Sequence, residues 1–192
     1  MRVEFRLSGS GGQGLLLAGI VLAEAAIEEG KNAVQTQSYG PEARGGSSKA
    51  EVVISEEDID YPKATDPDFL LALTKDSYRT YGKLMGKGTI IVDASVPLDP
   101  GIKARTLALP ILKTAAEDVG KMVVANIVAL GVLGGVSAVV DPATLEKAVL
   151  ARVPKGTEEL NLKALRAGFA LAGLTRKDDG FALAGKKPAE SR

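Results

Sequence analysis

Three glycines near the start of the chain have the spacing of a nucleotide-binding loop. The stretch RLSGSGGQGLLLAG, residues 6–19, holds Gly9, Gly11 and Gly14 between a strand-like apolar run and a helix-like one. A strand, a turn and a helix in this order gather backbone N–H groups and a helix N-terminus around one point, which favours an anion such as phosphate. Glycine suits such a turn because a Cβ would obstruct both the turn and the ligand.

The spacing alone leaves three interpretations open, namely a phosphate or pyrophosphate ligand, a standard dinucleotide, and a tight turn that serves packing only. A nicotinamide site also needs an acidic residue about 20 residues further on, at the end of the next strand. Here that strand offers Gln35, Thr36, Gln37 and Ser38, and no carboxylate. A P-loop would need Gly-Lys-Ser/Thr, which the loop lacks. These absences count against NAD and against ATP.

A second glycine-rich stretch, SYGPEARGGSSK, spans residues 38–49 and carries two cations, Arg44 and Lys49. Arginine presents a fork of donors that suits phosphate, and the glycines and serines leave N–H and hydroxyl groups unobstructed. The carboxyl ends of neighbouring strands in an α/β domain face one crevice, where both loops could meet. The alternative is a surface hairpin in which Arg44 is solvated or pairs with Glu42.

Composition removes several classes of chemistry. The 192 residues include no cysteine, no histidine and no tryptophan, and 24 lysines and arginines balance 24 aspartates and glutamates. The chain therefore cannot hold a thiolate-bound iron–sulfur cluster, a Ser-His-Asp triad or a common zinc set. Balanced charge gives no indication of nucleic acid or of an anionic membrane. No secretory signal opens the chain, and the expected location is cytoplasmic.

Hydrophobic periodicity predicts alternating strands and helices followed by a helical end. Strands are expected over residues 3–9, 32–39, 49–55, 68–74, 88–95 and 104–111, with the second and third able to pair as a hairpin. Helices are expected over 15–27, around 75–85, and over 112–119, 122–139, 142–151 and 157–174. This order predicts a three-layer α/β/α, Rossmann-like sheet domain with a helical C-terminal region. One domain is expected over residues 1–175, and a polar tail over 176–192.

Four further residues could act at a site or could be structural. Asn126 lies in an uncharged run of 19 residues, Met122 to Val140, which we interpret as a buried helix rather than a membrane span. The amide of Asn126 is expected to be hydrogen-bonded within or between helices. Asp93 ends a buried strand, where it could face a ligand or cap the next turn. Gly131 and Gly135 allow close helix approach, either within the domain or between subunits.

The two loops together resemble the gamma subunit of the 2-oxoacid:ferredoxin oxidoreductases. GSGGQG followed by QSYGPEARGGSSKAEVVIS carries the resemblance, which continues through VDASVP and ANIVALGVLGG to ELNLKALRAGF. The form SYGPEARGG is most similar to the 2-oxoglutarate branch. Enzymes of this family decarboxylate a 2-oxoacid on thiamine diphosphate, pass electrons through iron–sulfur clusters to ferredoxin, and transfer the acyl group to coenzyme A.

The resemblance implies that this chain is a subunit without catalytic residues of its own and inactive alone. Thiamine diphosphate and the clusters are implied on alpha and beta partner subunits, with or without a ferredoxin-like delta subunit, and coenzyme A is implied near this chain. No metal ligand is expected. The residues implied on the coenzyme A side are Gly9, Ser10, Gly11, Gly12, Gln13, Gly14, Arg44, Gly45, Gly46 and Ser47.

Two rival functions remain at this point. The chain could be a free-standing nucleotide-binding module that uses the first loop for NAD or ATP. It could also be a purely architectural subunit that never touches coenzyme A.

Overall fold

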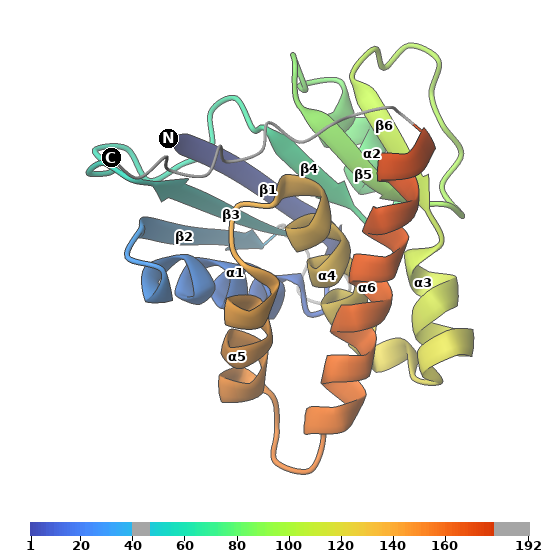
Figure 1. Cartoon of the computed structure of the whole chain (residues 1–192). Helices are drawn as coiled ribbons and strands as arrows, with labels where there is room; N and C mark the ends of the chain where they lie inside the picture. Colours follow the sequence, from blue (N-terminus) through green and yellow to red (C-terminus); the bar gives the residue numbers. More distant parts are fainter. Residues whose placement is uncertain (40–46, 179–192) are drawn as a thin grey trace, which may run out of the picture.

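The fold is taken from a computed structural model, which describes residues 1–39 and 47–178. Within this part of the chain, six strands form one sheet with the order β2-β3-β1-β4-β5-β6 (Figure 1). Strands β1, β4, β5 and β6 run parallel, whereas β3 is antiparallel to both of its neighbours. The strands are β1 (Arg2–Ser10), β2 (Asn32–Tyr39), β3 (Ser47–Ser55), β4 (Phe69–Ala72), β5 (Thr89–Asp93) and β6 (Arg105–Leu109).

The α/β fold class predicted from the sequence is confirmed, and so is the hairpin of β2 and β3. The strand order nevertheless differs from that of a dinucleotide-binding unit, in which the strand after the first helix pairs directly with β1. Here β3 lies between β1 and β2, and β2 is an edge strand. A residue at the end of β2 is therefore separated from the loop after β1 by one further strand. It is not placed to bind the ribose of a dinucleotide as in a standard dinucleotide-binding unit.

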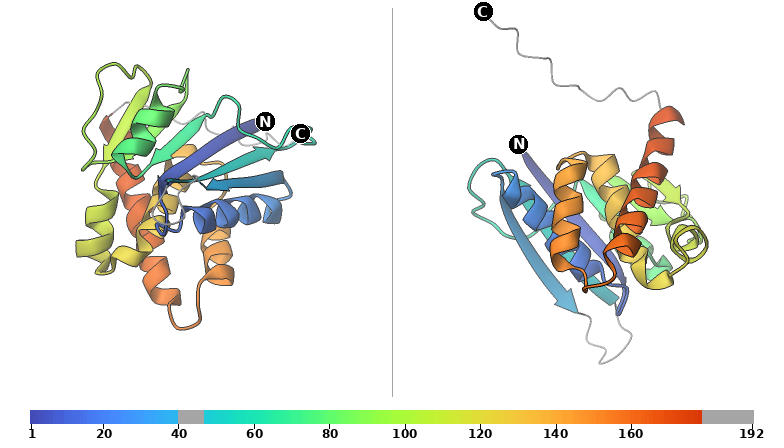
Figure 2. Two further views of the ribbon diagram at one scale, coloured as in Figure 1. Left: turned by 180° about the vertical axis from the view of Figure 1, so that it is seen from behind. Right: turned by 60° about the horizontal axis from the view of Figure 1, so that its bottom comes forward.

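Helices cover the sheet unequally on its two faces (Figure 2). On one face α1 packs against β2 and β3, and α4 packs against β4, with α5 and α6 behind them. On the other face α2 packs against β4 and β1 over a small apolar cluster that includes Tyr78 and Ile90. The helices are α1 (Leu15–Glu28), α2 (Lys75–Gly82), α3 (Ile111–Lys113), α4 (Ala125–Ser137), α5 (Pro142–Arg152) and α6 (Glu158–Asp178).

The helical end of the chain departs from the prediction in three places. The segment expected as one helix over 112–119 is α3 followed by a π-helix, Thr114–Val119, which ends at Gly120 with φ of 93°. The uncharged run opens with a 3₁₀ turn, Met122–Val124, before α4 begins. Helix α6 continues to Asp178, beyond the predicted end at Leu174. The boundary between domain and tail stays a prediction, because residues 179–192 lie outside the described part.

Helix α4 is too short to span a bilayer, and none of the helices described is long and apolar enough to do so. Its glycines serve packing within the domain instead. A Cβ on Gly131 would lie 2.2 Å from the carbonyl oxygen of Leu165, and one on Gly168 would lie 2.1 Å from that of Val128. The backbones of α4 and α6 are therefore in direct contact. Of the two roles considered for Gly131, packing within the domain or between subunits, the structure supports packing within the domain.

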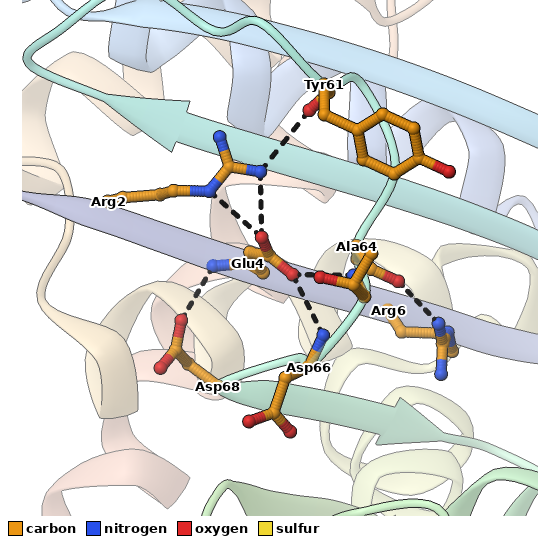
Figure 3. A network of polar contacts seen from close by, with 8 residues as sticks. Arg2, Glu4, Arg6, Tyr61, Ala64, Asp66 and Asp68 are labelled. Carbon is orange, nitrogen blue, oxygen red and sulfur yellow. Dashed lines mark hydrogen bonds and ion pairs between the residues drawn. The ribbon is translucent and has the colours of Figure 1, made fainter.

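Beside α2, a network of polar contacts covers the second face of β1 at Glu4 and Arg6 (Figure 3). The carboxylate of Glu4, only 7% exposed, accepts hydrogen bonds from the N–H groups of Thr65 and Asp66 at 2.8 and 3.2 Å. Arg6 donates to the carbonyl oxygen of Ala64 at 2.8 Å. The strand expected over residues 3–9 is present as β1, and the loop between β3 and β4 buries the polar side chains of Glu4 and Arg6.

Candidate functional site: the glycine loop

The glycine loop, residues 9–14, joins the carboxyl end of β1 to the start of α1. Gly9 and Ser10 are the last residues of β1, and Gly14 is the N-cap of α1. Gly12 and Gly14 have φ of 87° and 72°, a region that L-residues other than Asn and Asp rarely adopt. The backbone conformation thus favours glycine at two of the predicted positions.

The loop is braced from inside by Gln13. The side-chain Oε1 atom of Gln13 accepts a hydrogen bond from the N–H of Ser10 at 2.8 Å. The backbone N–H of Gln13 donates to the carbonyl oxygen of Ser10 at 3.3 Å. A Cβ on Gly9 would lie 2.2 Å from the same Oε1 atom. Gly9 is therefore a glycine because the Gln13 side chain folds against its Cα, and the N–H of Ser10 already has a partner.

The loop is braced from outside by Asn126, in the first turn of α4. The Nδ2 atom of Asn126 donates to the carbonyl oxygen of Gly14 at 3.2 Å. The side chain is buried, as expected, and it links the starts of two helices. The sequence indicated a hydrogen-bonded amide but gave no means of finding its partner 112 residues away.

The start of α1 is available to an anion. Within the described residues no side chain caps this helix, and its first turn contains no acidic residue. The N–H groups of the first turn, Leu15–Leu17, therefore have no intrahelical acceptor. Gly11 and Gly12 are exposed beside them. A negatively charged group at this point would be favoured by roughly 0.3–1 kcal/mol through the helix dipole alone.

The second predicted loop is anchored at the same edge of the sheet. Ser10 at the end of β1 pairs with Ser47 at the start of β3, and Tyr39 at the end of β2 pairs with Ser48. Strand register thus brings both ends of the second loop next to the first. Arg44, Gly45 and Gly46 lie outside the described residues, and Ser47 is described in its backbone only.

Lys49, considered as a second cation for this loop, is engaged within the sheet. Its Nζ atom lies 3.0 Å from Oε1 of Glu51, which also accepts from Nε of Arg6 at 2.8 Å. A lysine that already neutralises a buried carboxylate contributes less to an incoming anion. Arg44 is the cation that remains proposed for the second loop.

Asp93 is a structural carboxylate rather than a ligand residue. It is 2% exposed, and it accepts hydrogen bonds from the N–H of Ser95 at 2.9 Å and from the N–H of Leu112 at 2.8 Å. The side chain thus caps the turn after β5 and the start of α3. Of the two roles considered for Asp93, the structure supports the cap.

Two hollows on the described part of the molecule lie at the opposite end of the sheet from the glycine loop. One, of about 390 Å³, is lined by residues at the end of α4 and along α6, including Ala138 and Phe169. Another, of about 690 Å³, includes Met1, Glu29 and Lys31, beside the amino end of β1 and the end of α1. The part of the chain that the structure describes holds no cluster of three metal-ligating side chains.

Known proteins place the chain in a family. Residues 4–171 match the family model described as pyruvate ferredoxin/flavodoxin oxidoreductase. The 2-oxoglutarate synthase subunit KorC of Methanocaldococcus jannaschii is 47% identical over 177 residues, which cover 90% of this chain and 95% of that one. A keto/oxoacid ferredoxin oxidoreductase gamma subunit from Geobacter sulfurreducens superposes with a TM-score of 0.82 at 48% identity, covering 91% of this chain and 98% of that one.

The same fold recurs inside a longer protein. A 2-oxoglutarate:ferredoxin oxidoreductase from Magnetococcus marinus superposes with a TM-score of 0.82 over 95% of this chain and 33% of that one, at 23% identity. That identity shows a shared fold alone. Together with the closer relatives, the fold and the loop define the class of an α/β subunit of an oxoacid oxidoreductase.

The chain belongs to the pyruvate ferredoxin/flavodoxin oxidoreductase family. Within it, the chain is a gamma-type subunit of a 2-oxoacid:ferredoxin oxidoreductase and is similar to subunits of the 2-oxoglutarate branch. The family, branch and enzyme class expected from the two loops are confirmed. The predicted site residues are tested by none of these likenesses and stay a prediction.

Proposed function

We propose that this chain is the gamma subunit of a complex that oxidatively decarboxylates 2-oxoglutarate to acyl-coenzyme A, carbon dioxide and reduced ferredoxin. Its similarity to KorC subunits of 2-oxoglutarate synthase over most of both chains supports this substrate. The proposed partners are alpha and beta subunits, with or without a ferredoxin-like delta subunit, and ferredoxin is the proposed electron acceptor. The proposed location is cytoplasmic.

The glycine loop is proposed to bind the phosphates of coenzyme A. The observation that carries this proposal is the uncapped start of α1 beside Gly11 and Gly12, at the sheet edge where the second loop is anchored. Coenzyme A presents a pyrophosphate and a 3′-phosphate, which suit N–H donors and an arginine fork. We propose Gly11, Gly12 and Gly14 for backbone contact and Arg44 for charge, with Gly45, Gly46 and Ser47 beside it.

Gly9, Ser10 and Gln13 are proposed to shape this site. The mutual hydrogen bonds of Ser10 and Gln13 hold the turn open around the ligand position. Their part is to orient N–H groups before the ligand arrives, which lowers the ordering cost of binding.

The carbanion chemistry is assigned to thiamine diphosphate on the partner subunits, as are the iron–sulfur clusters. This chain has no cysteine to hold a cluster and no histidine for proton transfer. Its own residues are proposed to bind and orient coenzyme A, and we expect no turnover by the chain alone.

The function is tested by purification of the chain from its native host. Under this proposal it co-purifies with thiamine- and cluster-bearing chains, and the complex reduces ferredoxin only when both 2-oxoglutarate and coenzyme A are present. Recovery of a monomer that turns over unaided would overturn the proposal.

Calorimetry of the complex separates the rival ligands. Coenzyme A should bind, whereas tight binding of NADH or ATP by this subunit would favour a nucleotide-binding module. Arg44→Ala tests the architectural alternative, since an unchanged KM for coenzyme A in that variant would support a subunit that does not touch this substrate.

A further inference from the structure

We propose that Asn126 is a positioning residue for the coenzyme A site, which it serves by fixing the carbonyl of Gly14 and thereby the N–H groups of the glycine loop. This inference rests on the proposed function for the part that concerns coenzyme A. The part that concerns the loop stands on geometry alone.

Asn126 is a polar residue in an apolar setting. The first ten residues of α4 are buried, and Asn126 is the one among them whose side chain carries a hydrogen-bonding amide. It is 6% exposed. A buried amide destabilises a fold unless it is hydrogen-bonded, so its placement is explained by the bond that it makes.

The side chain of Asn126 is hydrogen-bonded to the carbonyl of Gly14, which also accepts the first backbone hydrogen bond of α1. The oxygen of Gly14 accepts from Nδ2 of Asn126 at 3.2 Å and from the N–H of Ala18 at 3.2 Å, which is the first bond of the helix. Both donors fix the orientation of the Gly14 peptide. That orientation sets the direction of the N–H groups in the first turn of α1.

Close packing reinforces the hydrogen bond. A Cβ built on Gly14 would lie 2.6 Å from Nδ2 of Asn126 and 3.0 Å from its Cγ. The amide therefore lies directly against the Cα of Gly14. A residue with a Cβ cannot be accommodated at Gly14 while Asn126 keeps this position. Gln13 braces the strand side of the loop, and Asn126 braces its helix side.

Asn161 provides a matched control. It is also an asparagine, is also 6% exposed, and also lies near the start of a helix. Its Nδ2 atom donates to the carbonyl oxygen of Thr157, the residue before α6, at 2.8 Å. Replacing it removes a buried amide without touching the glycine loop.

The test uses Asn126→Leu, which keeps the branch at Cγ and removes the donor, with Asn126→Ser as a smaller second variant if the first does not assemble. Each is compared with Asn161→Leu in the reconstituted complex. Amide hydrogen exchange over residues 9–17 reports the loop, and KM for coenzyme A and kcat report the site. We expect loop exchange to rise about three- to tenfold and KM to rise by a similar factor, with kcat at saturating coenzyme A unchanged.

Two outcomes decide the inference. Loop exchange no faster in the Asn126 variants than in Asn161→Leu overturns the positioning role. Faster loop exchange with an unchanged KM for coenzyme A supports the positioning role and instead contradicts the proposed coenzyme A site.

Discussion

Arg6 and Glu51 form a buried ion pair between two neighbouring antiparallel strands. Nε of Arg6 lies 2.8 Å from Oε1 of Glu51, and the two side chains are 10% and 4% exposed. The pair lies under the loop that joins β3 to β4, which Arg6 also holds through the carbonyl oxygen of Ala64. Tyr81 of α2 lies against the guanidinium, with its ring centroid 5.3 Å from Cζ. One arginine therefore ties together a strand, a loop and a helix.

Glu51→Ala should destabilise the chain strongly, because it leaves the guanidinium of Arg6 buried without its counter-charge. We expect the free energy of unfolding in urea to fall by about 3–5 kcal/mol. Glu28→Ala is the control, since Glu28 meets Lys147 at 3.5 Å with side chains that are 47% and 69% exposed. That change should cost less than about 1 kcal/mol. Equal losses in the two variants would contradict the structural role of the buried pair.

The contact of α4 with α6 predicts opposite effects for two glycines of one helix. Gly168→Ala should destabilise the chain by about 2 kcal/mol or more, because its Cβ would meet the backbone oxygen of Val128 at 2.1 Å. A Cβ at Gly173 meets nothing within 4 Å, so Gly173→Ala should stabilise α6 by about 0.5–1 kcal/mol. Thermal unfolding of both variants checks this, and a stable Gly168→Ala would argue against the close crossing.

Gly14 and Gly12 give a comparison of strain with and without a clash. Both have positive φ, but only a Cβ at Gly14 meets Asn126. Gly12→Ala should cost about 1 kcal/mol from backbone strain, and Gly14→Ala should cost more. When Asn126 is replaced by serine, the difference in lost stability between Gly14→Ala and Gly12→Ala should become smaller, because the smaller side chain leaves space next to the Cα of Gly14. An unchanged difference in that background would show that the two residues are not coupled.

Glu29 should make stability depend on pH in the acid range. Burial raises the pKa of the Glu29 carboxyl. Hydrogen bonds from Lys31 and from the N–H of Asp141, both at 2.6 Å, lower that pKa by more than burial raises it. The pKa of Glu29 therefore lies below its ordinary value of 4.5. A carboxyl whose pKa is depressed in the folded state stabilises the fold above the ordinary value, and it loses this contribution as pH falls through the folded pKa. The Tm difference between the natural chain and Glu29→Gln should therefore be full above about pH 5 and should shrink below pH 4.5. A difference that stays constant down to pH 3 would contradict this account.

The local elements were predictable because each is encoded in a short stretch. Alternation over Val3–Gly9 predicts β1, and Gly30, which has φ of 77°, marks the end of α1 as expected. The glycine loop was predictable for the same reason, since its turn, its glycines and its helix lie within about a dozen residues. Its position at a sheet edge follows from the strand that precedes it.

What could not be predicted depends on residues far apart in the chain. The insertion of β3 between β1 and β2 is a matter of pairing, which periodicity does not report. The cover that residues 61–68 provide over the polar side chains of β1 depends on contacts about 60 residues apart in the chain, which no local pattern reports. The partner of Asn126, which lies 112 residues away in the chain, is also set by a tertiary contact.

The central claim, that the glycine loop binds the phosphates of coenzyme A, is tested most directly at Gly12. This residue is exposed, has φ of 87°, and has open space where a Cβ would lie. Asparagine and aspartate tolerate positive φ best among L-residues, so Gly12→Asn and Gly12→Asp should fold alike and differ by one negative charge.

The measurement is the KM for coenzyme A of the reconstituted complex with each variant, alongside the KM for 2-oxoglutarate. We predict a KM for coenzyme A about tenfold higher in Gly12→Asp than in Gly12→Asn, because a carboxylate near a bound phosphate repels it, and a difference that narrows as salt is added. The KM for 2-oxoglutarate should be the same in both. Equal KM values for coenzyme A in the two variants would contradict the claim.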